Sequence, residues 1–208
     1  MLRLYDFWES GNAYKVRLLL SQLEQPFERV HLDILEGETR TPEYRALNAV
    51  CRVPMVEWPD GRRLTESNAI LFYLADGSDY LSATAWGRAQ ILQWHNFEQY
   101  LHEPNIAVVR FWHFAGLLDE NQDALPVKMR RGYLALDVME EHLSSNDFFV
   151  DDYYSIADIS LYAYTHVAAE GGFEMDRYPQ IQLWLDRIRE QPRHIRITDE
   201  VGTLVEWP

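Results

Sequence analysis

The chain has 208 residues, of which 47% are hydrophobic and 25% charged, and its formal net charge at pH 7 is −14. This composition is typical of a globular protein, so we expect one large or two small folded domains rather than disorder. The acidity disfavours nucleic acids and anionic membranes as partners, because their phosphate groups are repelled. The single cysteine, Cys51, excludes an intrachain disulfide and suits a reducing cytoplasm. The chain start does not resemble a signal peptide, and without about 20 consecutive apolar residues we expect no membrane-spanning helix.

The first thirty residues predict a strand, a helix and a second strand. Apolar and polar residues alternate over 2–7 and again over 27–32, as in half-buried strands. Between them, a turn at 10–12 leads into an amphipathic helix with apolar residues at helical spacing: Val16, Leu19, Leu20 and Leu23. Its polar side is expected to carry Lys15, Arg17, Ser21 and Gln22. This order predicts a βαβ unit with two parallel strands.

Three further elements complete the predicted N-terminal domain. A short helix is expected over 42–47, with Thr41 as its N-cap and proline in its first turn. A hairpin is expected over 55–64, because the sequence Pro-Asp-Gly favours a tight turn. A helix over 67–75 precedes the short polar segment 77–79, which is the best candidate for a domain boundary. We therefore predict an α/β domain over residues 1–76.

The rest of the chain predicts helices almost throughout, so we expect an all-α domain over residues 84–208. Apolar residues recur at helical spacing in four segments: 86–101, 129–143, 159–167 and 181–188. Before the third segment, Ser155 and Asp158 have the spacing of an N-capping box, in which each side chain bonds the backbone of the other residue. We interpret this pair as a structural device that starts a helix.

Three segments together resemble the bacterial glutathione transferase family. The strand with Tyr5, the turn 10–12 and the helix start at 15–17 resemble the opening of that family. Val53-Pro54 followed by residues 66–70 resembles its glutathione-binding half, and residues 155–159 resemble the buried capping box of its helical domain. The resemblance implies a thioredoxin-like N-terminal domain and a C-terminal helical bundle that supplies an electrophile pocket. It also implies a cytoplasmic homodimer that acts in detoxification.

The turn Ser10-Gly11-Asn12 is similar to the Nu-class and Ure2-like branch of that family. It departs from the beta class, which has a cysteine in this region, and it lacks the Cys-x-x-Cys motif of thiol-reducing relatives. A glutathione thiol must ionise, and a hydroxyl donor beside a helix N-terminus can lower its pKa. We therefore expect Ser10 to be the main thiolate donor and Asn12 the second, with turn formation and helix capping as the alternative for both. Tyr14 is the reserve donor, whereas Tyr5 is expected to pack.

The resemblance assigns the remaining parts of glutathione to further residues. The family has a cis proline at the position of Pro54, and the backbone of Val53 is implied to pair with the cysteinyl part. Ser67 at a helix N-terminus suits the γ-glutamyl carboxylate, and Glu66 suits the ammonium group. The carboxylate of the glycine part is expected to meet one of two arginines, Arg40 and Arg52.

Residues of the second half have less specific expectations. We expect Arg110 and Trp112, with Tyr14, to line the pocket for the second substrate, although core packing is the usual role of such an aromatic cluster. We interpret Cys51 as a structural thiol, because a reactive one requires exposure and a lowered pKa. His95 and His102 lie seven residues apart, but the surrounding sequence has no metal-binding pattern.

The predicted function is that of an enzyme, a glutathione transferase that activates the thiol of its cosubstrate glutathione for attack on a small electrophile or a peroxide. Two alternatives share the fold: a glutathione-dependent disulfide-bond reductase and a non-catalytic glutathione-binding protein. A maleylacetoacetate-type isomerase needs a serine-cysteine turn that this sequence lacks. The C-terminal tail over 198–208 is expected either to cover the pocket or to lie on the surface.

Overall fold

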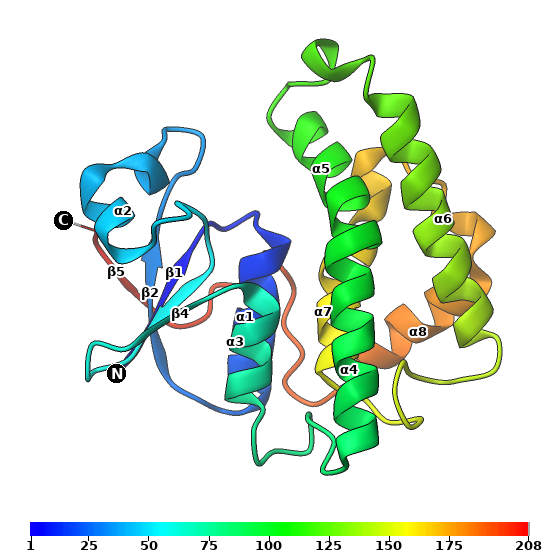
Figure 1. Cartoon of the computed structure of the whole chain (residues 1–208), viewed down its shortest axis with the longest axis horizontal. Helices are drawn as coiled ribbons and strands as arrows, with labels where there is room; N and C mark the ends of the chain where they lie inside the picture. The colour runs from blue at the N-terminus through cyan, green and yellow to red at the C-terminus, as the bar shows by residue number, and fades with distance from the viewer. Residues whose placement is uncertain (208) are drawn as a thin grey trace. The chain divides into compact units, whose positions relative to one another are not determined.

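The computed structural model describes residues 1–207, which divide into two compact units (Figure 1). Unit 1 consists of Met1–Asp76 and of the C-terminal tail from Pro192, and unit 2 of Gly77–Gln191. The first unit therefore ends where the α/β domain was expected to end. The tail was expected in the helical domain but belongs to unit 1; the last residue of the expected range, Pro208, lies outside the described residues.

Unit 1 is built on a five-stranded sheet with the order β4-β3-β1-β2-β5. Strands β1 (Leu2–Asp6) and β2 (Phe27–His31) are parallel and are connected by helix α1 (Gly11–Gln22), as the sequence predicts. Strands β3 (Met55–Glu57) and β4 (Arg63–Thr65) form the predicted antiparallel hairpin, and β3 also pairs antiparallel with β1.

Helices cover both faces of this sheet. Helices α1 and α3 (Ser67–Leu74) lie side by side on one face (Figure 1) over a core of Leu2, Leu4, Val16, Leu20, Phe27, Val56 and Ile70. Helix α2 (Pro42–Leu47) covers the other face, where the core contains Tyr5, Val30, Leu32, Tyr44 and Met55. It follows a 3₁₀ turn, η1 (Glu38–Arg40), and Thr41 caps it by accepting a hydrogen bond from the backbone N–H of Tyr44. Successive side chains of β1 point to opposite faces of the sheet, so Leu2 and Leu4 belong to one core and Tyr5 to the other.

The fifth strand, β5 (Thr203–Val205), comes from the C-terminal tail and pairs parallel with β2. This strand was not expected from the sequence, because three residues are too few to show a period and their partner lies far away in the chain. It covers what would otherwise be an open sheet edge, which is prone to pair with other chains. Beyond it, Trp207 packs against the core on the α2 side.

Helix α1 is buried on more sides than its sequence pattern indicates. Lys15 and Arg17, expected on a polar outer side, are both 0% exposed. The guanidinium of Arg17 lies 3.6 Å from the Asp6 carboxylate and donates a hydrogen bond to the backbone oxygen of Trp8. Burial raises the pKa of Asp6, and the two nearby guanidiniums of Arg17 and Arg29 partly oppose that rise. The expectation of an exposed polar side was therefore wrong, because these cations have partners inside unit 1.

Unit 2 is helical, as expected. Its first long helix runs through α4 (Ala85–Phe97), a π-helical turn η2 (Glu98–His102) and α5 (Glu103–Phe114). It packs against α6 (Leu125–Leu143). The short 3₁₀ turns of this unit are η3 (Asp119–Asn121), η4 (Ala168–Gly171) and η5 (Met175–Arg177).

Helix α7 (Ile156–Thr165) is buried over its whole length, and α8 (Pro179–Arg189) buries one side. The predicted capping box starts α7, with Ser155 and Asp158 bonding each other's backbone. Across the described part of the chain, no helix combines the length and the apolar character that a membrane span requires.

Candidate functional site

The start of α1 combines a helix N-terminus with a hydroxyl group. Ser10 is the N-cap, and its Oγ accepts a hydrogen bond from the backbone N–H of Ala13 at 3.2 Å. The side chain is partly exposed, and the first turn of α1 contains no acid. Among the residues that the structure describes, no acceptor takes the hydroxyl hydrogen of Ser10. Because a helix N-terminus is partially positive, this group is placed to donate to an anion.

A buried lysine links the starts of α1 and α3. The Nζ of Lys15 donates to the Oδ1 of Asn12 at 2.9 Å and to the Oγ of Ser67 at 3.4 Å. The Ser67 hydroxyl in turn donates to the same Asn12 oxygen at 3.2 Å. The structure thus brings two predicted site residues, Asn12 and Ser67, into one hydrogen-bonded group.

Sequence reasoning missed Lys15 as part of this group. Its position three residues after Asn12 places both side chains on one side of α1, which is a signal the sequence contains. Its second partner, Ser67, lies 52 residues further along the chain. The role of Lys15 is therefore visible only once α3 has been placed beside α1.

Helix α3 starts with an unusual backbone conformation. Glu66 is its N-cap, with φ 67° and ψ 110°, and its exposed side chain makes no capping hydrogen bond. A non-glycine residue at positive φ typically costs about 1–3 kcal/mol, and such residues cluster at ligand-binding sites. The carboxylate of Glu66 is therefore available at the surface beside the first N–H groups of α3.

The loop before β3 is fixed by helix α2. The backbone oxygen of Arg52 accepts hydrogen bonds from the Tyr44 hydroxyl at 2.7 Å and from Nδ2 of Asn48 at 2.8 Å. Burial raises the pKa of the Tyr44 phenol, so this group stays a donor. The following Val53–Pro54 peptide bond is cis. The backbone of this loop is thus held while the Arg52 side chain remains exposed.

Two other residues singled out in the sequence precede this loop in the chain. Arg40 is exposed at the end of η1, before α2, so its guanidinium lies at the surface. Cys51 is partly buried at φ 58°, with its Sγ 3.9 Å from the backbone oxygen of Ala49.

The two tyrosines weighed as thiolate donors are bonded elsewhere. Tyr14 is fully buried, and its hydroxyl donates to the backbone oxygen of Ile195 at 2.6 Å. The hydroxyl of Tyr5 donates to Glu57 at 2.9 Å, and burial together with this bond raises the pKa of Tyr5 to about 12. The reserve role of Tyr14 as donor or pocket residue therefore finds no support in its surroundings.

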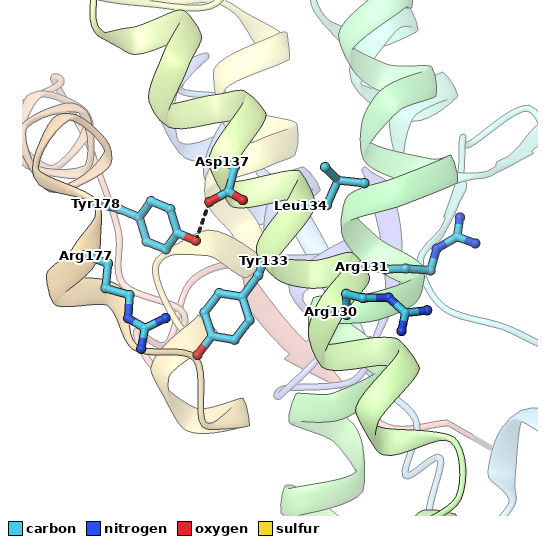
Figure 2. Close-up of a pocket in the computed structure, with 7 residues that line it drawn as sticks. All are labelled: Arg130, Arg131, Tyr133, Leu134, Asp137, Arg177 and Tyr178. Atoms are coloured by element: carbon cyan, nitrogen blue, oxygen red, sulfur yellow. Dashed lines mark hydrogen bonds between the residues drawn. The ribbon is translucent and has the colours of Figure 1, made fainter.

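The two helical residues expected at a pocket also have packing roles. Arg110 is buried in α5, and its Nε lies 2.6 Å from a Glu170 carboxylate oxygen. Trp112 is buried in the same helix. A hollow of about 750 Å³ in unit 2 is lined by other residues: Arg130, Arg131, Tyr133, Leu134, Asp137, Arg177 and Tyr178. Figure 2 shows the Tyr178 hydroxyl turned toward Asp137 on α6.

The two histidines considered for a metal site are also engaged within unit 2. His95 contacts the backbone oxygen of Ile156, and His102 contacts the Thr165 hydroxyl. Within residues 1–207 the structure contains no group of three or more histidine, cysteine, aspartate or glutamate side chains that could hold a metal ion.

Family models match both units. Residues 1–76 match the N-terminal domain of glutathione S-transferase, and residues 101–192 match its C-terminal domain. The chain belongs to the glutathione S-transferase family. The matches agree with the N-terminal α/β and C-terminal helical architecture expected from the sequence.

Relatives of known structure or name cover nearly the whole chain. A glutathione S-transferase from Pseudomonas fluorescens is 49% identical with a TM-score of 0.93, over 95% of this chain and 99% of that one. A glutathione transferase from Pseudomonas putida, solved with one glutathione disulfide per subunit, is 27% identical with a TM-score of 0.82, over 92% and 88%. The glutathione S-transferase-like protein LUC7 from Fusarium is 31% identical, over 90% of this chain and 88% of its own.

Proposed function

We propose that this family member is a glutathione transferase that ionises the thiol of glutathione at the start of α1, for attack on a small electrophile or a peroxide. The observation that carries the proposal is the Ser10 hydroxyl. Its oxygen caps the helix while its hydrogen has no acceptor among the described residues. A glutathione thiolate is an acceptor that suits this donor.

The energy required is within reach of these groups. A free thiol has a pKa of about 8.5, and lowering it by about two units requires roughly 2.7 kcal/mol of preferential thiolate binding. The Ser10 hydroxyl, the Asn12 amide nitrogen and the α1 N-terminus together can supply this amount. Lys15 adds a buried positive charge at the Asn12 oxygen and keeps that amide oriented.

The remaining parts of glutathione are assigned to the other predicted residues. The γ-glutamyl carboxylate meets Ser67 and the α3 N-terminus, and its ammonium group meets the exposed carboxylate of Glu66. The backbone at Val53, before Pro54, pairs with the cysteinyl part. Two exposed arginines are available for the carboxylate of the glycine part: Arg40 and Arg52. These local cations matter because the net charge of −14 repels an anionic ligand.

A second candidate function is glutathione-dependent disulfide-bond reduction. The observation in its favour is the Pseudomonas putida relative, which binds one glutathione disulfide per subunit. The chain contains a single cysteine, so it has no protein dithiol for this reaction; two glutathione thiols reduce the substrate disulfide and leave as glutathione disulfide.

We further propose that the protein is a cytoplasmic homodimer with a role in detoxification. Large apolar side chains are strongly exposed along α4 and η2, namely Trp86, Leu92 and Tyr100. Exposed apolar side chains mark an interaction surface where they form a contiguous patch, and we propose that these three contribute to one. A solution mass equal to one chain contradicts the dimer.

Calorimetric titration with reduced and with oxidised glutathione tests the function, using the native protein, Ser10→Ala and Ser155→Ala. Ser155 is the matched control, since it also caps a helix but lies in unit 2. Binding of reduced glutathione supports the transferase if the absorbance of the bound thiolate, measured separately, is lost in Ser10→Ala and kept in Ser155→Ala. A preference for the oxidised form supports the reductase, and no binding of either form contradicts both.

A further inference from the structure

The C-terminal tail is attached to unit 1 at two places. Near its beginning, the backbone oxygens of Arg193 and Ile195 accept hydrogen bonds from Ser21 and Tyr14 of α1, at 3.0 and 2.6 Å. Further along, β5 pairs with β2 from Glu28 to Val30. The tail is therefore part of the same compact unit as residues 1–76, although the match to the N-terminal domain of the family ends at residue 76.

The last described residue, Trp207, contacts two tyrosine rings. Its ring centroid lies 5.6 Å from that of Tyr5 and 6.0 Å from that of Tyr44, with interplanar angles of 78° and 82°. Edge-to-face contacts of this kind are favourable beyond the burial of apolar area. The two tyrosine rings also contact each other, at 5.9 Å. Trp207 therefore completes an aromatic cluster, defined here as Tyr5, Tyr44 and Trp207.

Through Tyr44, the aromatic cluster reaches the loop before β3. The Tyr44 hydroxyl donates to the backbone oxygen of Arg52, and the side chain of Val53 packs against the same core as Trp207. A tyrosine ring has few ways to move once its faces and edges are covered. Contacts that fix the Tyr44 ring therefore also fix the Arg52 carbonyl group and the backbone at Val53.

We propose that Trp207 is a positioning residue for glutathione: carried by β5, it holds Tyr44 so that residues 52–54 keep the conformation that pairs with the cysteinyl part. This inference rests on the proposed function of that loop. It predicts that loss of Trp207 weakens glutathione binding and raises KM for glutathione. It also predicts that kcat at saturating glutathione and its pH profile stay unchanged, because the proposed thiol donor, Ser10, is held by the start of α1 and not by this loop.

The chain provides its own reporter for this loop. Cys51 is the only cysteine, it lies next to Arg52, and it is partly buried. Its rate of labelling by an uncharged thiol reagent therefore reports how often the loop opens, with no glutathione present. The matched control is Leu204→Ala, because Leu204 is a large apolar residue of β5, three residues before Trp207, but is 61% exposed.

The experiment compares Trp207→Ala, Tyr44→Phe and Leu204→Ala with the native full-length protein. We expect Cys51 to be labelled faster in Trp207→Ala and in Tyr44→Phe than in the native protein, and glutathione binding to be weaker, each by roughly 3- to 10-fold. Leu204→Ala should match the native protein in both measurements. Tyr44→Phe removes one hydroxyl only, so it carries the test if Trp207→Ala fails to fold.

Two outcomes overturn the proposal. Labelling and binding that are the same in Trp207→Ala as in Leu204→Ala show that the tail does not position the loop, and the same result for Tyr44→Phe shows that the Tyr44 hydroxyl does not connect the aromatic cluster to the loop. Faster labelling with unchanged glutathione affinity shows that the loop does not hold glutathione. If the native protein binds no glutathione at all, the proposed function fails, and the labelling comparison alone then decides whether the tail braces the loop.

Discussion

Two serines start helices in this protein, and their hydrogen bonds differ. Ser155 is fully buried at α7, where its hydroxyl accepts from the backbone N–H of Ala157 at 3.2 Å and donates to Asp158 at 3.1 Å. Ser10 at α1 accepts from the N–H of Ala13, also at 3.2 Å, but is partly exposed. The third residue of each helix accounts for the difference, because Asp158 takes the hydroxyl hydrogen and Ala13 cannot.

The comparison separates a cap that is structural alone from one that we propose to be functional as well. A cap whose donor and acceptor capacities are both used inside the protein contributes to stability alone. A cap that uses only its acceptor capacity also stabilises the helix and keeps a donor for a ligand. Replacing Ser155 or Asp158 should therefore change stability, and replacing Ser10 should change chemistry.

The largest expected effect is that of Asp158→Ala. The buried carboxylate accepts hydrogen bonds from the backbone N–H groups of Phe149 and Ser155 and from the indole of Trp184. Leaving these donors unsatisfied should lower the free energy of unfolding by about 3–5 kcal/mol, measured by denaturant unfolding. The exposed Asp186→Ala, which breaks only a surface ion pair with Arg189, should cost less than about 1 kcal/mol. Equal losses in the two variants would contradict the importance of the buried box.

A pH dependence should accompany this buried carboxyl group. Burial raises the pKa of Asp158 from 3.8 to about 6, and its hydrogen bonds oppose only part of that rise. Between these values the folded state keeps a proton that the unfolded state releases, so stability falls as the pH rises. The fall from this group should approach roughly 3 kcal/mol above pH 6. The free energy of unfolding should be measured at several pH values in the native protein and in Asp158→Asn, and this fall with rising pH should occur only in the native protein. The same pH dependence in both proteins would refute the prediction.

The smallest expected effect is that of Ser155→Ala. The substitution removes one hydroxyl from the box and leaves the bond between the Ser155 N–H and Asp158, so we expect a loss of about 0.5–2 kcal/mol. Thermal unfolding measures it, and glutathione-dependent activity per folded molecule should stay at the native level. A loss of activity without a loss of stability would reverse the roles assigned to the two serines.

Local signals were sufficient for much of the fold. The alternation of β1 and β2, the capped start of α2 and the box at α7 each depend on neighbouring residues, and the structure contains all of them. For the candidate site, the sequence predicted Ser10 as a thiolate donor with capping as the alternative; the structure contains the cap, and the hydroxyl hydrogen without an acceptor among the described residues became visible only when its surroundings were known.

Features that depend on distant partners were not predictable in the same way. The hydrophobic pattern of α1 placed Lys15 and Arg17 on an exposed side of the helix. Their buried partners, Ser67 and Asp6, belong to other elements, so the pattern of α1 alone could not indicate them. The strand β5 is too short to show a periodicity, and it forms by pairing with the edge of the sheet at β2. The tail was therefore assigned to the helical domain, although it lies in unit 1.

The most direct test of the role proposed for Ser10 is a spectroscopic pH titration of the thiol of bound glutathione. It compares the native protein with Ser10→Ala and Ser10→Thr. We expect the bound thiol in the native protein to titrate about one to two units below the free value of about 8.5, and Ser10→Thr to preserve most of this shift. In Ser10→Ala the pKa should return toward the free value while glutathione still binds. An equally low pKa in Ser10→Ala and in the native protein would contradict the account.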